Sequence, residues 1–168
     1  MRRKALYMCR LLVWLALLSF TVSCSSSDDV VYIFTGKTWK LTFIANEGST
    51  QQVDYWGNQS WDNSMNLLKQ PDNFTITFTG AEMPDESTQG TFKARGAAST
   101  PEGKWTVAAG SRNLTMSSST GTAETDVLAK AFVNALQHTV YYSGDSNNLY
   151  IYFKEGQWTR YLALYPVK

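Results

Sequence analysis

Cysteine and histidine are almost absent from this chain of 168 residues. Its two cysteines, Cys9 and Cys24, both lie in the first 24 residues, so the remainder carries no thiol. That remainder can form no disulfide, no thiolate zinc site and no cysteine nucleophile. A lone histidine, His138, cannot build a metal site. We therefore expect neither a metal nor a cofactor.

Long apolar runs and clustered positive charge are lacking as well. The main apolar run, residues 11–20, is half as long as the ~20 residues that a membrane-spanning helix needs. Fifteen Lys and Arg residues face fourteen acids, and four of the bases lie before residue 24. Without residues 1–23 the chain has eleven bases and fourteen acids, a formal charge of −3. Nucleic-acid binders usually have a basic face, so we expect no nucleic-acid partner.

What the N-terminus does contain is an export pattern. Four positive residues precede the apolar run, small and polar residues follow it over 21–23, and then comes Cys24; the positive residues are Arg2, Arg3, Lys4 and Arg10. This order is typical of a secretory signal peptide, so we expect residues 1–23 to be removed. The alternatives are a signal without lipidation and a retained helix.

The end of this pattern resembles the lipobox of bacterial lipoproteins, although Thr21 stands where that motif usually has Leu. The resemblance implies that Cys24 is acylated and anchors the protein in the outer membrane of a Gram-negative cell. Residues 24–35 are then expected to form a flexible tether. Its acidic pair, Asp28 and Asp29, resembles an export tag for the cell surface; the alternative is a spacer in the periplasm.

Residues 36–168 have the length and composition of a single β-rich domain. Apolar and polar residues alternate with a period of two, which predicts strands with one buried face. The expected strands are Thr38–Phe43, Phe74–Thr79, Thr91–Arg95, Lys104–Ala108, Asn113–Ser117, Thr139–Tyr142, Leu149–Phe153 and Trp158–Val167. A four-residue loop, 154–157, is expected to join the last two in a hairpin.

Two helices are expected between these strands. An apolar stripe at i, i+3 and i+4 predicts a packed helix over Glu124–Gln137, capped by Thr122 or Thr125. A shorter helix is predicted over Asn63–Gln70, ending before Pro71. It lies in the polar region 46–71, which has the character of an insertion.

The order of these parts resembles the META domain, found in the heat-shock protein HslJ and in related bacterial lipoproteins. The stretches that carry the resemblance are Gly36–Leu41, Gly90-Thr91-Phe92, Leu114-Thr115-Met116, Glu124 with Phe132 and Leu136, Val140–Gly144 and Asn148–Tyr152. It implies a mainly β (α+β) fold, a curled antiparallel sheet or a small barrel-like META or lipocalin-like domain with one packed helix. META domains have no agreed enzymatic activity, so it also implies a protein that is not an enzyme.

An aromatic group in the polar region is the main candidate for ligand contact. Tyr55, Trp56 and Trp61 lie among Asn, Gln and Asp residues, where aromatic faces can stack on sugar rings. The alternative is that these rings cap one end of the sheet, since large aromatic side chains usually bury their area.

The other candidates have simpler interpretations. The acids Asp54, Glu82, Asp85 and Glu86 lie in predicted loops without a catalytic pattern, and we expect solvated carboxylates. His138 follows the packed helix, where histidine usually contacts a free carbonyl. Four tyrosines of the last hairpin alternate opposite the core face, as a cross-strand ladder or a flat binding face; they are Tyr150, Tyr152, Tyr161 and Tyr165.

The sequence therefore predicts an envelope lipoprotein that is held to the membrane by its lipid and acts, without catalysis, by contact with another protein or in maintenance of the cell envelope. The alternative is a lipoprotein that binds a glycan or small ligand at Tyr55, Trp56 and Trp61.

Overall fold

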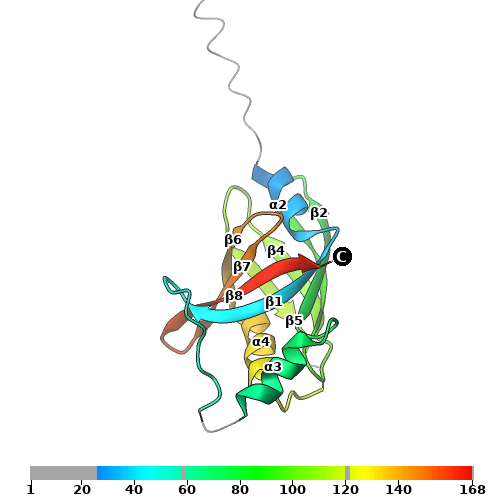
Figure 1. Cartoon of the computed structure of the whole chain (residues 1–168). Coiled ribbons are helices and arrows are strands. Elements are labelled where there is room, and N and C mark those ends of the chain that lie inside the picture. Colours follow the sequence, from blue (N-terminus) through cyan, green and yellow to red (C-terminus); the bar gives the residue numbers. More distant parts are fainter. Residues whose placement is uncertain (1–25, 58–59, 120–121, 168) are drawn as a thin grey trace, which may run out of the picture.

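The described residues, 26–57, 60–119 and 122–167 of a computed structural model, form one antiparallel sheet of eight strands (Figure 1). Their spatial order is β5-β4-β3-β2-β1-β8-β7-β6. The strands are β1 (Thr38–Asn46), β2 (Thr75–Glu82), β3 (Thr88–Arg95), β4 (Glu102–Val107), β5 (Leu114–Ser118), β6 (Thr139–Gly144), β7 (Leu149–Glu155) and β8 (Trp158–Val167). The expectation of a mainly β, curled antiparallel sheet is confirmed.

The strands form where the apolar residues alternate. In β2, Ile76 and Phe78 are buried, whereas Thr77 and Thr79 are exposed. The hairpin of β7 and β8 is also present, but its turn is tighter than expected. Glu155 pairs with Trp158, so only two residues remain in the turn. Gly156 in that turn has a φ of +59°, which glycine adopts without steric cost.

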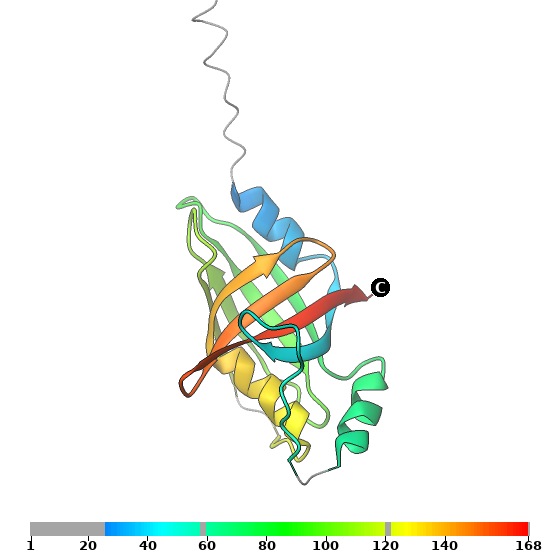
Figure 2. The same cartoon turned by 60° about the vertical axis from the view of Figure 1, so that its left-hand side comes forward.

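β1 is an internal strand of the curled sheet and pairs with β2 through Trp39 and Ile76 and with β8 through Leu41 and Leu164. The curl brings the edge strands β5 and β6 together (Figure 2). In the described chain they share one bridge, Asn113 with Tyr141, so the sheet is nearly closed without a continuous ladder.

Aromatic rings fill the inside of the curl. The largest fully buried side chains are Trp39, Trp105, Phe34, Phe74, Phe78, Phe92, Phe132 and Phe153. Several of these rings contact one another: Phe78 and Trp105, for example, meet edge to face with centroids 5.6 Å apart. The interior is therefore a packed core.

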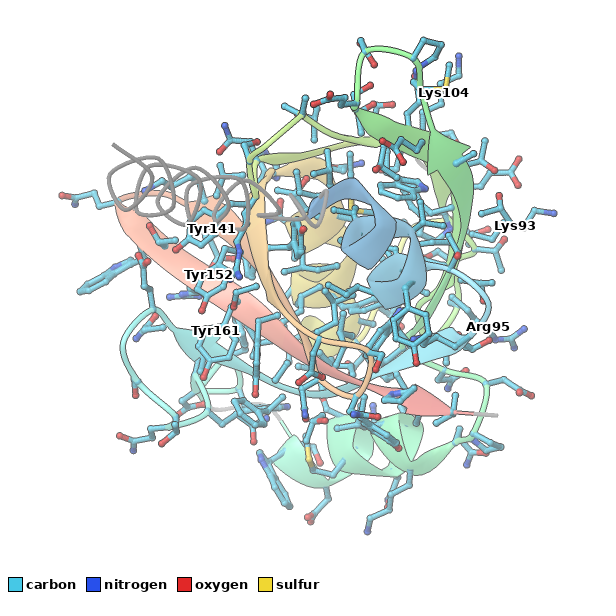
Figure 3. All side chains as sticks on the ribbon, turned by 90° about the horizontal axis from the view of Figure 1, so that it is seen from above. Lys93, Arg95, Lys104, Tyr141, Tyr152 and Tyr161 are labelled. Atoms are coloured by element: carbon cyan, nitrogen blue, oxygen red, sulfur yellow. The ribbon has the colours of Figure 1, made fainter. Side chains whose placement is uncertain are left out.

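Helix α2 (Ser26–Phe34) closes one end of the curl, where a flexible tether was expected. Val30 and Phe34 are 5% and 0% exposed. The Phe34 ring stacks on Trp105 at 4.8 Å and meets Tyr142 at 4.9 Å. Seen from above, α2 lies over the opening that the strands surround (Figure 3). The tether expectation is wrong for residues 26–35, because an apolar face docks them on the sheet.

Helices α3 (Trp61–Lys69) and α4 (Val127–Gln137) lie at the other end of the curl (Figures 1 and 2). Both were expected, with different bounds. Asp126, and not Thr122 or Thr125, caps α4, because its carboxylate accepts the Ala129 N–H at 3.0 Å. No helix within the described ranges is long and apolar enough to cross a membrane.

Candidate functional site

The structure separates the three aromatic residues that the sequence grouped. Trp56 is 6% exposed, and its indole N–H donates to Ser64 Oγ at 2.7 Å. Trp61, the first residue of α3, is 51% exposed. The two rings meet edge to face at 6.3 Å. Trp56 is thus a core residue, while Trp61 is open to solvent.

Tyr55 points to a different part of the surface. Its hydroxyl donates to Glu155 Oε2 at 3.3 Å, and the Arg160 guanidinium lies 5.0 Å from its ring centroid. Arg160 also forms an ion pair with Glu155. Burial raises the pKa of Tyr55 to about 12. Ligand contact at Tyr55 or Trp61 stays a prediction, whereas Trp56 belongs to the packing of the domain.

A chain of hydrogen bonds fixes this region to α4. Ser64 donates its hydroxyl hydrogen to Asp126 Oδ2 at 2.6 Å and accepts the Trp56 indole. Asp126 also caps α4 through the Ala129 N–H. Because all three side chains are buried, each polar atom needs the next as its partner.

Glu124 is a buried carboxylate that the sequence did not single out. It is 8% exposed and accepts the backbone N–H groups of Ala97, Ala98 and Ser99 at 2.9–3.2 Å. The Ser99 hydroxyl donates to it at 2.6 Å. Glu124 therefore ties the β3–β4 connection to the start of α4. A second acid, Asp126, follows two residues later, and the predicted helix contained both acids.

The loop acids have local partners. Asp85 Oδ1 accepts the N–H and hydroxyl of Ser87, and these bonds lower the pKa of Asp85. Asp54 Oδ1 accepts a hydrogen bond from the backbone N–H of Trp56 at 2.9 Å. Glu82 ends β2, so it is not a loop residue, and Glu86 is exposed.

His138 Nδ1 lies 2.9 Å from the Asn134 carbonyl oxygen, the expected partner. Within the described part of the chain, His, Cys, Asp and Glu nowhere gather in threes as metal ligands do.

The outer face of β6, β7 and β8 carries the tyrosines (Figure 3). Tyr161 contacts Tyr152 at 5.4 Å and Tyr150 at 5.6 Å, which confirms contact among these three. Tyr141, which was not predicted, stacks on Tyr152 at 4.2 Å. Tyr165 makes no ring contact with described residues and is 40% exposed. The rings other than Tyr165 contact one another, which favours a cross-strand ladder over a flat binding face.

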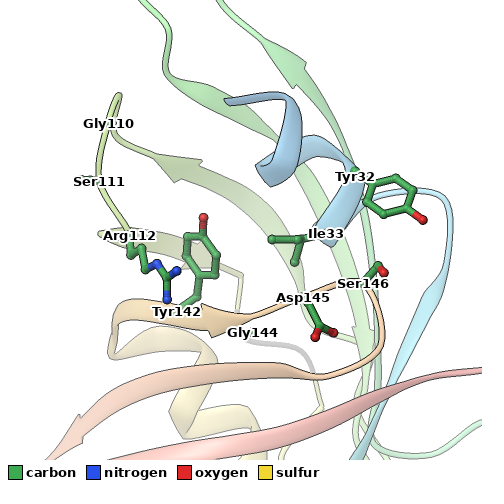
Figure 4. Close-up of a pocket in the computed structure, with 9 residues that line it drawn as sticks. All are labelled: Tyr32, Ile33, Gly110, Ser111, Arg112, Tyr142, Gly144, Asp145 and Ser146. Carbon is green, nitrogen blue, oxygen red and sulfur yellow. The ribbon is translucent and has the colours of Figure 1, made fainter. Parts of the chain in front are cut away.

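Surface pockets lie at both ends of the curl. At the α2 end, a pocket of about 510 Å³ lies at the seam between β5 and β6 (Figure 4). It is lined by Tyr32, Ile33, Gly110, Ser111, Arg112, Tyr142, Gly144, Asp145 and Ser146. Asp145 Oδ1 accepts hydrogen bonds from the backbone N–H groups of Asn147 and Asn148, and these bonds lower the pKa of Asp145.

At the opposite end, two pockets flank the segment that precedes α3. One, of about 300 Å³, is lined by Asp54, Trp56 and Trp61 among others. The second, of about 480 Å³, lies between Tyr55 and α4. The predicted aromatic group is thus divided between two pockets rather than gathered in one.

Comparison with known proteins corrects the META assignment. A family model described as "Domain of unknown function (DUF4847)" matches residues 25–166, which includes the whole stretch that carried the META resemblance. No curated protein matches the sequence. The crystal structure of a DUF4847 family protein from Bacteroides vulgatus ATCC 8482 has a similar fold, with a TM-score of 0.53 and 21% identity over 79% of this chain and 96% of that one. The resemblance to META was wrong because it rested on the order of short strands, which unrelated antiparallel sheets share. The chain belongs to the DUF4847 family.

Proposed function

We propose that this protein is a lipoprotein of the bacterial cell envelope whose β domain binds a partner or ligand and does not catalyse a reaction. The leader pattern over residues 1–23 and the lipobox-like end at Cys24 support the anchor. These residues lie outside the described part of the chain. Only Ser25 separates Cys24 from the start of α2.

The observation that carries the proposal is a difference between the two ends of the domain. An anchor at Cys24 would hold the α2 end toward the membrane. The opposite end contains Trp61 and the β7–β8 turn with Trp158, the first residue of β8, and these side chains are 51% and 60% exposed (Figures 1 and 2). Exposed Trp and Tyr side chains are enriched at interaction sites, and the one on α2, Tyr32 at 69% exposure, would lie on the membrane side of such an anchor. The end opposite α2 would therefore face away from the membrane and meet the partner.

The arrangement of the carboxylates supports binding over catalysis. The buried acids Glu124 and Asp126 both hold backbone N–H groups of the fold. A catalytic acid or base must instead reach a bound substrate. Because aromatic rings fill the interior of the curl, the surface pockets at its ends are the places left for a ligand.

Mass spectrometry of the protein purified from envelope fractions tests the anchor. The expected N-terminus is an acylated Cys24, and the Cys24→Ala variant should lack the lipid. An N-terminus at Met1, or an unmodified Cys24, would overturn the envelope assignment.

Photo-crosslinking in cells tests which end binds. A crosslinking amino acid at position 158 should capture a component, whereas the same amino acid at Thr115, an exposed position on β5, should not. Equal capture at both positions, or none at 158, would contradict a binding end opposite α2.

A further inference from the structure

The groove beside α4 contains the parts of a small-ligand site. Its volume of about 480 Å³ is within the ~300–1,000 Å³ of small-molecule pockets. In Figure 2 the segment before α3 runs alongside α4. The groove, named here the α4 groove, is lined by Tyr55, Val127, Lys130, Ala131, Asn134 and Glu155.

Three of these residues offer polar atoms that the described part of the chain leaves unused. Lys130 and Asn134 are four residues apart on α4 and therefore project from the same face. In the described ranges, neither side chain has a hydrogen-bond partner. Glu155 is 30% exposed; Oε2 accepts from Tyr55 and Arg160, while Oε1 accepts from no described residue.

The remaining lining is apolar and held in place. Val127 and Ala131 lie one turn apart on α4, beside the Tyr55 ring. The ring is fixed by its hydroxyl bond to Glu155 and by the guanidinium of Arg160, 5.0 Å from its centroid. A ring that is already ordered loses little conformational entropy when a ligand packs on it.

The charges around the α4 groove offset one another. The lining has one positive and one negative side chain, Lys130 and Glu155, and Glu155 also forms an ion pair with Arg160. The groove therefore presents donors and acceptors without a net charge. That combination suits hydroxyl groups, each of which can donate and accept, and disfavours a ligand with a strong charge.

We propose that the α4 groove binds a neutral saccharide. The apolar face of a sugar ring would pack on Tyr55 and Ala131. Its hydroxyls would donate to Glu155 Oε1, accept from Lys130 Nζ, and do both with the Asn134 amide. This inference rests on the proposed binding function and names its ligand class and site.

Titration of the acylated full-length protein in a zwitterionic, sugar-free detergent tests this site. The probes are neutral trisaccharides of glucose, galactose, mannose, xylose and N-acetylglucosamine, with trigalacturonic acid as the charged comparison. Calorimetry and saturation-transfer NMR should detect at least one neutral probe with a Kd of about 1 mM or tighter. Asn134→Ala and Lys130→Met should each weaken binding about tenfold, equivalent to about 1.4 kcal/mol. The matched control, Lys104→Met, makes the same change at an exposed lysine of β4 outside the groove and should bind normally.

Several results would overturn the inference. Absence of binding to all neutral probes, preference for the acidic probe, or loss of binding in Lys104→Met with retention in Asn134→Ala would each do so. Acylation is measured separately on the same protein. An acylated protein that binds no sugar refutes the α4 groove alone, and an unacylated protein that binds refutes the envelope anchor alone.

Discussion

Helices close both ends of the curled sheet and pack apolar side chains against the core, and the α4 end has buried carboxylates as well. At the α2 end, Phe34 enters the core among Phe78, Trp105 and Tyr142. At the α4 end, Glu124 and Asp126 hold backbone N–H groups and a serine hydroxyl. Apolar packing has little directionality, whereas a buried carboxylate fixes the positions of its donors. The difference indicates that the α4 end, which carries the proposed ligand site, is the more precisely oriented of the two.

The largest expected effect tests the apolar closure. Phe34→Ala removes a fully buried ring that contacts three other rings, so we expect the free energy of unfolding to fall by about 3–5 kcal/mol. Urea denaturation measures the loss. Tyr32→Ala on the same helix is the control, because Tyr32 is 69% exposed and should change stability by less than about 0.5 kcal/mol. A loss below about 1 kcal/mol for Phe34→Ala would mean that α2 does not close the core.

Glu124→Ala tests the polar closure. It leaves the N–H groups of residues 97–99 without their acceptor, and we expect a loss of about 2–3 kcal/mol. Amide hydrogen exchange should become faster at these residues. Glu82→Ala, at the exposed end of β2, is the matched control and should be close to neutral. Unchanged exchange at residues 97–99 would contradict the role of Glu124.

The hydrogen-bond chain at Ser64 is expected to contribute less. Ser64→Ala leaves the Trp56 indole N–H and Asp126 Oδ2 without their common partner, so stability should fall by about 1–2 kcal/mol. Ser117→Ala, on the exposed side of β5, serves as the control. In a double-mutant cycle, Ser64→Ala and Asp126→Asn should couple by about 1 kcal/mol. Additive losses would show that the two residues act independently.

The smallest effect is a pH dependence at the α4 end. The folded-state pKa of Tyr55 is about 12, above its ordinary value of 10.0. Between these values the unfolded chain loses the Tyr55 proton while the folded protein keeps it, so stability falls as the pH rises. Tyr55→Phe should remove part of this alkaline decline, as measured by thermal unfolding from pH 9 to about 12. Tyr165→Phe, at an exposed tyrosine, is the control. Equal declines in both variants and the parent protein would contradict the assignment.

The sequence predicted the elements whose signal is local. Alternation located strands such as β2 and β7, because one buried face leaves a period of two, and the spacing of turn residues located others, such as β3 to β5. The apolar stripe located α4, because one buried helix face leaves apolar residues at i, i+3 and i+4. The pairing of β1 with β8 was not predicted, because it joins residues more than a hundred positions apart, such as Lys40 and Tyr165.

Helix α2 was missed because its stability comes from tertiary contacts. Nine residues form a marginal helix in isolation, and the serines and aspartates that make up the first part of α2 are typical of a flexible segment. The signal was the spacing of Val30 and Phe34, four residues apart, on what becomes the buried face. Two residues at that spacing are too few to distinguish a docked helix from a tether.

The candidate site was predicted only in part. Tyr55 does line a pocket, but its partners Lys130 and Asn134 come from α4, far along the chain. The proximity of Tyr55, Trp56 and Trp61 in sequence suggested one shared surface. The structure instead buries Trp56 in the core, while the half-buried Tyr55 lines the pocket beside α4.

The pairing of β1 with β8 has a consequence for how the chain is synthesised. β8, the last strand of the sheet in chain order, supplies the second neighbour of the first strand, so the curl cannot close until β8 has emerged. Contacts between such distant segments form slowly, because a long loop must be ordered before they contribute. If the chain is exported as proposed, a precursor with this topology would stay unfolded, and hence competent for translocation, until β8 reaches the far side of the membrane.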